Sequence, residues 1–326
     1  MTPQSTQKMV SDQSLPLELV YHVIESLVPS NPHALLPPSH IATKTLLAMA
    51  RVCRDTHGLA TRLLRQRCVY INTKRRLADL LLCLNRFVPS LPPVLTLRNM
   101  TSLYLEPFGR KLYDQPTAIW VRELFCEISE SLKRLVVLMP FQTLDPFNDH
   151  LQIRRTLREG FEQLHRLEEF VCIQDYPTLS VWDGPTDVWR LWPDLRRLTL
   201  FGTPLDSHWL WWDIATLPKL EHVILACSTN SQGTNIKDEY FHKLPPDDVR
   251  LDRDIKVVLM GGHWLRKGVN TTRWKEIDPK GRMTVEVHGV DNSDSEESRP
   301  VTKYVKKMAL EGCLWDGENK RIDESD

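Results

Sequence analysis

The sequence predicts an α/β protein in which an N-terminal module of three helices is followed by an irregular solenoid of strand-helix units. Three observations predict this fold. Apolar residues recur at helical spacing between residues 14 and 70, a short alternating phrase recurs between residues 100 and 225, and segments with helical spacing lie between successive phrases. Because a helix must cross over between strands for a parallel sheet to form, this alternation predicts a curved stack with a continuous core.

The first 70 residues contain a disordered start and three predicted helices. Residues 1–13 are polar and carry no apolar period, which predicts disorder. A helix is expected in "SLPLELVYHVIESLV", where Ser14 can cap it, Pro16 fits its first turn and Glu18 favours its positive end. Four prolines in the segment from Pro29 to His40, with Pro29 included, predict a loop. Helical spacing resumes in "TKTLLAMARVCRDTHGLATRLLRQRC", where a glycine divides the apolar positions into two helices.

The blocks "LPLELVYHVIESL" and "LLAMARVCRDTHGLA" together resemble the F-box. They show a Leu-Pro-x-Glu-Leu opening, an Ile and a Leu further on, and an apolar helix that ends in Val-Cys-Arg, over about 50 of the 326 residues. The resemblance implies a three-helix module over residues 14–70 that binds the Skp-type adaptor of a cullin-RING ubiquitin ligase. Two features depart from the family pattern. The proline-rich connection is longer than usual, and Thr56 stands where the family commonly has a Trp.

The same resemblance assigns adaptor-facing residues one by one. Independently of the family, an amphipathic helix pair binds by burying a few apolar anchors in a partner's groove, and a handful of anchors dominates the affinity. The residues carried over from the motif are Leu15, Pro16, Glu18, Leu19, Ile24, Leu27, Leu47, Val52 and Cys53.

The body of the protein, predicted to span residues 71–290, carries the repeated phrase apolar-x-x-apolar-x-apolar. It reads Met100-x-x-Leu103-x-Leu105, Leu132-x-x-Leu135-x-Val137, Leu167-x-x-Phe170-x-Cys172, Leu195-x-x-Leu198-x-Leu200 and Leu220-x-x-Val223-x-Leu225. First positions differ by 32, 35, 28 and 25 residues, at and above the upper end of leucine-rich-repeat lengths. The phrase resembles the degenerate leucine-rich repeats that follow many F-boxes, particularly in fungal proteins. A non-repeat α/β domain gives a similar pattern and remains an alternative.

Six tryptophans lie within 31 residues of the body, namely Trp182, Trp189, Trp192, Trp209, Trp211 and Trp212. Such a cluster is either the core of a large unit or an exposed recognition surface. The helical spacing of "HWLWWDIATL" favours core for most of them. Trp182 lies in the "SVWDGPTD" loop and is the predicted contact to a target protein, because loops carry recognition.

The C-terminal region contains two more predicted strands, a linker and a helix. "DIKVVLMGG" and "GRMTVEVHGV" are expected to be strands. Residues 291–299 are rich in acidic residues and serine, which predicts an acidic linker. Residues 300–326 form a predicted C-terminal helix and tail, and "VTKYVKKMALEGCLW" is expected to return and pack on the body.

Composition and missing motifs narrow the function to protein binding. With 42 basic and 42 acidic residues, the chain lacks the positive field typical of proteins that bind nucleic acids or anionic membranes. The seven scattered cysteines are typical of reduced core residues, which predicts a cytoplasmic or nuclear protein. No apolar stretch reaches membrane-spanning length, and no zinc, dinucleotide, P-loop or hydrolase motif occurs. We therefore predict no metal, no cofactor and no enzymatic activity.

The main functional hypothesis is a substrate-recognition adaptor of a Skp-cullin-F-box ubiquitin ligase. In this hypothesis the N-terminal helices hold the Skp-type adaptor of the cullin ligase, and a concave surface of the body presents an unknown target protein. The first alternative is an interaction scaffold of leucine-rich-repeat type with no ubiquitin-ligase role. The second is an enzyme whose acid-base pairs assemble from distant positions. The main hypothesis requires that the apolar residues from Leu15 to Cys53 be left exposed by their own chain.

Overall fold

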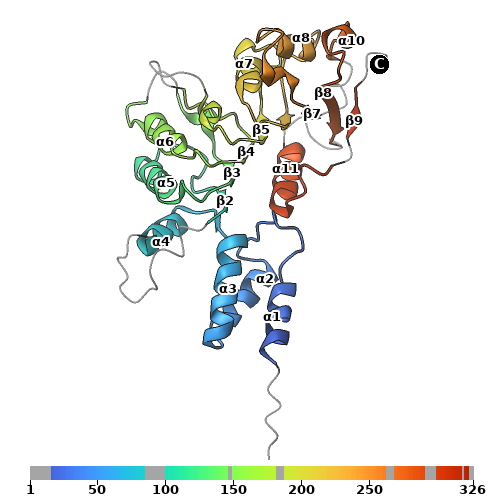
Figure 1. Ribbon diagram of the computed structural model, residues 1–326. Coiled ribbons are helices and arrows are strands. Elements are labelled where there is room, and N and C mark those ends of the chain that lie inside the picture. The colour runs from blue at the N-terminus through green and yellow to red at the C-terminus, as the bar shows by residue number, and fades with distance from the viewer. Residues whose placement is uncertain are drawn as a thin grey trace, which may run out of the picture.

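The computed structural model describes residues 16–84, 100–145, 149–180, 187–261, 268–290, 299–317 and 319–322. Three short helices form one end of the molecule, and a curved sheet with helices along its outer side forms the rest (Figure 1). The α-helices of the described residues are α1 (Leu17–Ser26), α2 (Ile41–Met49), α3 (Arg54–Arg67), α4 (Lys74–Leu84), α5 (Gln115–Ile128), α6 (Ile153–Glu162), α7 (His208–Thr216), α8 (Ile236–Phe241), α10 (Trp274–Ile277) and α11 (Arg299–Glu311).

All described strands belong to one nine-stranded sheet, in which they follow one another in sequence order. The strands are β1 (Tyr70–Ile71), β2 (Ser102–Leu105), β3 (Arg134–Leu138), β4 (Glu169–Ile173), β5 (Arg197–Phe201), β6 (His222–Ala226), β7 (Ile255–Gly261), β8 (Met283–Gly289) and β9 (Lys320–Arg321). Strands β1 to β8 are parallel, and β9 pairs with β8 in the antiparallel sense. The predicted α/β class is confirmed.

The repeated phrase marks equivalent positions of neighbouring strands. Its central apolar residues stand opposite one another across the sheet, in the order Leu103, Leu135, Phe170, Leu198 and Val223. All five are fully buried in the larger core, between the sheet and the outer helices. The segments between the phrases therefore differ in length, but the phrases themselves lie in register across the sheet. The expected strands of the C-terminal region are β7 and β8.

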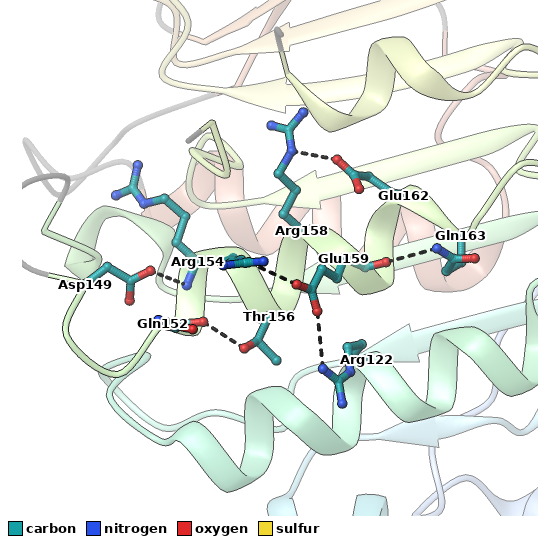
Figure 2. A network of polar contacts seen from close by, with 10 residues as sticks. Arg122, Asp149, Gln152, Arg154, Thr156, Arg158, Glu159, Glu162 and Gln163 are labelled. Carbon is teal, nitrogen blue, oxygen red and sulfur yellow. Dashed lines mark hydrogen bonds and ion pairs between the residues drawn. The ribbon is translucent and has the colours of Figure 1, made fainter. Parts of the chain in front are cut away.

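Helices α5 and α6 of the outer layer pack unusually closely. A Cβ on Gly160 of α6 would lie 2.9 Å from the Arg122 Cα of α5, so only glycine allows this approach. One ion pair crosses the contact, as Figure 2 shows: the Glu159 carboxylate accepts from Arg122 of α5 at 3.2 Å. Within α6, the same carboxylate accepts from Arg155 at 3.2 Å. At the start of α6, the Asp149 carboxylate accepts two backbone N–H groups, which caps the helix.

Three tryptophans of the cluster are core residues, as predicted. Trp189, Trp192 and Trp211 are fully buried, and the indole N–H groups of the last two donate to backbone carbonyls at 2.9 Å and 2.7 Å. Trp212 is partly buried against the same core. For Trp209 the core prediction is wrong, because its side chain is 65% exposed on α7.

Helix α11 covers the face of the sheet opposite to the outer helices. Its residues Val301, Val305 and Ala309 are buried against a second core that includes Tyr104 and Val136, which stand between the core positions of their phrases. The C-terminal helix thus returns to the body, as predicted. The expected open concave face is wrong along these strands, because α11 occupies it. The apolar side of α11 packs against the apolar middle residues of four of the five phrases, Tyr104, Val136, Val171 and Ile224.

The proline-rich connection forms no helix and joins the N-terminal helices to the rest of the molecule. Leu35 N–H donates to the Leu310 carbonyl of α11 at 2.7 Å, and Leu36 N–H donates to the Arg67 carbonyl of α3 at 2.7 Å. Ala34, Leu35 and Leu36 are buried. The length of this connection is therefore used in a packed junction.

A buried arginine of β3 lies at the centre of this junction. The Arg134 guanidinium donates to the Glu169 carboxylate of β4 at 2.7 Å, to the His33 carbonyl of the connection and to the Ala309 carbonyl of α11. The side chain is 4% exposed. Three segments that are distant in the sequence are therefore bound by one side chain.

Some predicted features lie outside the described residues, and others need correction. Residues 1–13 and most of the acidic linker, 291–298, lie outside the described residues. Helices α4, α8 and α10 and strands β1 and β9 were not predicted. All seven cysteines are free, but Cys172 is the one that is buried, so core burial is wrong for Cys53 and Cys126, which are exposed.

Gly312 should be the glycine least tolerant of a side chain. Its φ is +76°, and a Cβ there would lie 2.8 Å from the His33 carbonyl carbon and 2.9 Å from the Ala34 nitrogen. We expect Gly312→Ala to lower the free energy of unfolding by about 2–4 kcal/mol, from backbone strain plus overpacking. Gly281→Ala is the matched control, because φ is +64° there but no atom lies within 4 Å. Equal losses for the two variants in urea titrations would contradict a packed junction.

Candidate protein-docking site

The three N-terminal helices share a small core of their own. Ile24 of α1, Leu46 of α2 and Ala60 of α3 are fully buried in it, and partly buried residues of all three helices surround them. Because this core is separate from those of the sheet, the module holds its helices together mainly through these contacts. The remaining apolar side chains of the helices are then available on their outer surfaces.

Most of the predicted adaptor-facing residues are exposed in the described chain. Leu19 is 50% exposed, Leu47 is 52% exposed and Val52 is 68% exposed. Pro16, Glu18 and Cys53 are exposed as well, and Leu15 lies outside the described residues. Exposure leaves these side chains accessible to a partner, and their binding role stays a prediction.

Helix α1 carries two apolar stripes. Val20, Ile24 and Leu27 face the core of the module, whereas Leu19 and Val23, four residues apart, face outward. The assignment of Ile24 as a residue that touches the adaptor is wrong, since it is fully buried in its own chain. Leu27 is half-buried and belongs mainly to the core. Val23 was missed as an outward residue, although its spacing from Leu19 could have indicated it.

The turn between α2 and α3 presents Val52 and Cys53 at the start of α3. Thr56 fixes this turn: its hydroxyl donates to the Met49 carbonyl at 2.9 Å and accepts the Cys53 N–H at 3.2 Å. Thr56 is buried, so this small hydrogen-bonding side chain is enclosed by its own chain. Hydrogen bonding with Thr56 lowers the pKa of the Cys53 thiol, which is exposed.

Exposed large apolar side chains are concentrated on this module. Of the eleven found among the described residues, six belong to residues 17–52: Leu17, Leu19, Val23, Ile41, Leu47 and Val52. Single exposed apolar residues are ordinary on a protein surface, but a concentration of them is typical of an interaction site.

The predicted target contact, Trp182, lies outside the described residues. The described chain leading toward it is held by two buried arginines of α6, which Figure 2 shows pointing away from the α5 contact. Arg158 donates to the Leu179 carbonyl at 3.2 Å, and Arg154 donates to the Ser180 carbonyl at 3.3 Å. These contacts fix the backbone that precedes residue 181.

Buried ionisable groups gather near the same part of the body. The Tyr176 hydroxyl donates to the Asp187 carboxylate, and Asp213 of α7 pairs with Arg190 at 3.3 Å. Burial raises the pKa of Asp213 to about 7, against the pull of Arg190. Asp213 is 1% exposed, so it is inaccessible to a substrate in this conformation.

The described residues were compared with two simple requirements, one for a metal site and one for a membrane-spanning helix. No three His, Cys, Asp or Glu side chains there are grouped so that they could hold a metal ion. Among the described helices, none combines the length and the apolar character needed to cross a membrane. Comparison of the chain with protein-family models, with curated proteins and with solved structures finds no match.

The two stripes of α1 should respond differently to truncation. Ile24→Ala leaves a cavity in the core of the module and should lower the free energy of unfolding by about 2–5 kcal/mol. Leu19→Ala removes a half-exposed side chain and should change it by less than about 0.5 kcal/mol. Urea titration followed by circular dichroism measures both. Similar losses would mean that Leu19 is also part of the core.

Asp213 should make the stability of the protein depend on pH. Because its pKa is raised from 3.8 to about 7 in the folded state, the folded protein binds the proton more tightly than the unfolded chain. Stability should therefore fall as pH rises from about 4 to 7, by no more than about 4 kcal/mol, and level off above. Urea titrations at several values between about pH 5 and 8 measure how stability changes with pH. Asp213→Asn should make this change smaller. An unchanged slope would show that Asp213 is not the titrating group.

Proposed function

We propose that the protein is a substrate-recognition adaptor of a Skp-cullin-F-box ubiquitin ligase. The exposed apolar residues of α1 and α2 and of the turn before α3 form the docking site for a Skp-type adaptor. The body, with its in-register phrases, is a degenerate solenoid of leucine-rich-repeat type that carries the target protein. The single observation that supports the docking site most strongly is the exposure of Leu19, Leu47 and Val52 on a module whose own core is already filled.

Exposure of these anchors is what a docking site requires. If the chain itself had buried them, docking would need the module to unfold, at the full cost of its core. Leu19, Leu47 and Val52 are instead held at half exposure or more by a separate core, so they can bind without rearrangement. The buried Ile24 keeps a role in the proposal, because it sets the positions of the helices that present the anchors.

An interaction scaffold with no ubiquitin-ligase role is the second candidate. It keeps the fold and the exposed module but gives the module a different partner. Thr56, in place of the Trp common in the family, favours this candidate, because it changes the side chain at the start of α3. The nature of the protein bound by the module separates the two candidates.

Charged residues at the anchors should abolish binding to the Skp-type adaptor. In co-expression with a Skp-type adaptor, we expect Leu47→Asp and Leu19→Asp each to reduce co-purification at least tenfold, since loss of an anchor typically costs about 2 kcal/mol or more. Val249→Asp is the matched control, because Val249 is 81% exposed on the body and should leave recovery unchanged.

The outcomes separate the candidates. Wild-type protein that folds but fails to recover a Skp-type adaptor would remove the ligase role and leave the scaffold. Full recovery with Leu47→Asp and Leu19→Asp combined would show that the adaptor binds elsewhere. Thermal unfolding of each variant verifies that the module remains folded.

A further inference from the structure

A second apolar surface lies on the body, where the outer helices lead back into the sheet. A groove of about 550 Å³ opens there between the end of α7, the turn after α6 and two short 3-10 helices, η3 (Val188–Leu191) and η4 (Val249–Asp252). Leu191, Trp212 and Leu217 supply apolar side chains, and Pro193 and Pro218 stiffen its sides. Leu191 is 36% exposed, so part of this apolar surface faces solvent.

Every titratable side chain that lines the groove is basic. These residues are His165, Arg190 and Arg250, and no acidic residue lines the groove in the described part of the chain. The two arginines have acidic partners that stand outside the lining. Asp213 is buried behind Arg190, and Asp248 precedes Arg250 in its own turn at 2.6 Å.

Those partners hold the arginines in place without covering them. The side chains of Arg190 and Arg250 remain 29% and 38% exposed. A guanidinium carries five N–H donors in a planar fork, so one that already pairs with a carboxylate still has donors for a second. The groove therefore combines an apolar floor with fixed hydrogen-bond donors of positive charge.

We propose that this groove binds a short acidic peptide segment of a partner protein. An apolar side chain of the segment packs against Leu191 and Trp212, and carboxylates on either side pair with Arg190 and Arg250. Charge complementarity selects the acidic segment, and tryptophan and arginine are the residue types that dominate binding energy at interfaces. The volume lies within the range of about 300–1,000 Å³ typical of ligand pockets.

This site is separate from the docking site on the N-terminal helices. The groove is built from elements between residues 165 and 250, whereas the docking site belongs to residues 16–53. Binding of the peptide does not depend on the ligase role. If the protein is an adaptor, the acidic segment belongs to its target.

A labelled peptide tests the proposal on the full-length protein. The probe is a fluorescein-labelled peptide of about eight residues, a length that a groove of this kind can contact. It carries a central Leu-Phe pair with aspartate and glutamate on both sides. Fluorescence anisotropy should show saturable binding that weakens at higher salt. Leu191→Asp should weaken it at least tenfold and Arg250→Glu at least fivefold. Trp209→Ala, which removes a side chain that is exposed on α7 and outside the lining, is the matched control and should bind like wild type.

A second peptide separates charge from apolar contact. The sequence of residues 291–298, Asp-Asn-Ser-Asp-Ser-Glu-Glu-Ser, is acidic without an apolar residue, and as a free labelled peptide it should bind at least tenfold more weakly than the probe. Equal binding of the two peptides would overturn the proposal, because the apolar floor would then contribute nothing.

Three further results would also overturn it. They are no saturable binding by the wild type, unchanged binding by both Leu191→Asp and folded Arg250→Glu, or wild-type dimers in sedimentation that Leu191→Asp dissociates. The last would assign the groove to a second copy of the chain. Leu47→Asp should bind the probe like wild type, so failure of the docking site and failure of the groove are distinguishable.

Discussion

The Arg134 guanidinium is the interaction on which the arrangement of the molecule depends. Burying a charge costs several kcal/mol unless its donors are satisfied, and here the acceptors come from β4, from the proline-rich connection and from the end of α11. Removal of any one segment would leave a buried cation with unpaired donors. The sheet, the connection and the C-terminal helix are therefore expected to form and unfold as one cooperative unit, although their sequences are far apart.

This cooperation also fixes the N-terminal helices relative to the body. Only residues 68 and 69 separate α3 from β1, and the Val69 carbonyl already accepts the Tyr104 N–H of β2 at 3.1 Å. On the other side, the connection is bonded to both α3 and α11. Helices joined in this way hold a constant distance and angle to the sheet. That rigidity suits the proposed adaptor role, because ordering a flexible joint would cost conformational entropy when a partner binds.

The sequence predicted the body better than the docking site, for a physical reason. The positions of each phrase that face the outer helices must be apolar because both the sheet and a helix cover them, so Leu103 and Leu135 were recognised from spacing alone. In α1, Leu19 and Ile24 belong to adjoining apolar stripes, and periodicity does not tell which stripe the other helices bury. That choice depends on tertiary packing. The sequence also contained an indication that α11 covers the second face of the sheet. Tyr104 and Val136, which stand between the core positions of their phrases, are apolar, whereas residues on an open sheet face would be polar.

Alternating charges explain how units of irregular length keep their order in the sheet. At the first strand positions, basic Arg134 is followed in register by acidic Glu169 and then by basic Arg197. One position earlier in the chain, Lys133 pairs with Glu168 at 2.8 Å, and further along the sheet Arg196 pairs with Glu221 at 2.7 Å.

The exposed pairs contribute at most about 1 kcal/mol each, so they add little to stability. Their effect is on specificity. A unit that skipped its neighbour would place Arg134 beside Arg197, and like charges directly opposite in a sheet are destabilising. Apolar burial therefore stabilises the stack without distinguishing its members, whereas the charges determine which strand stands next to which.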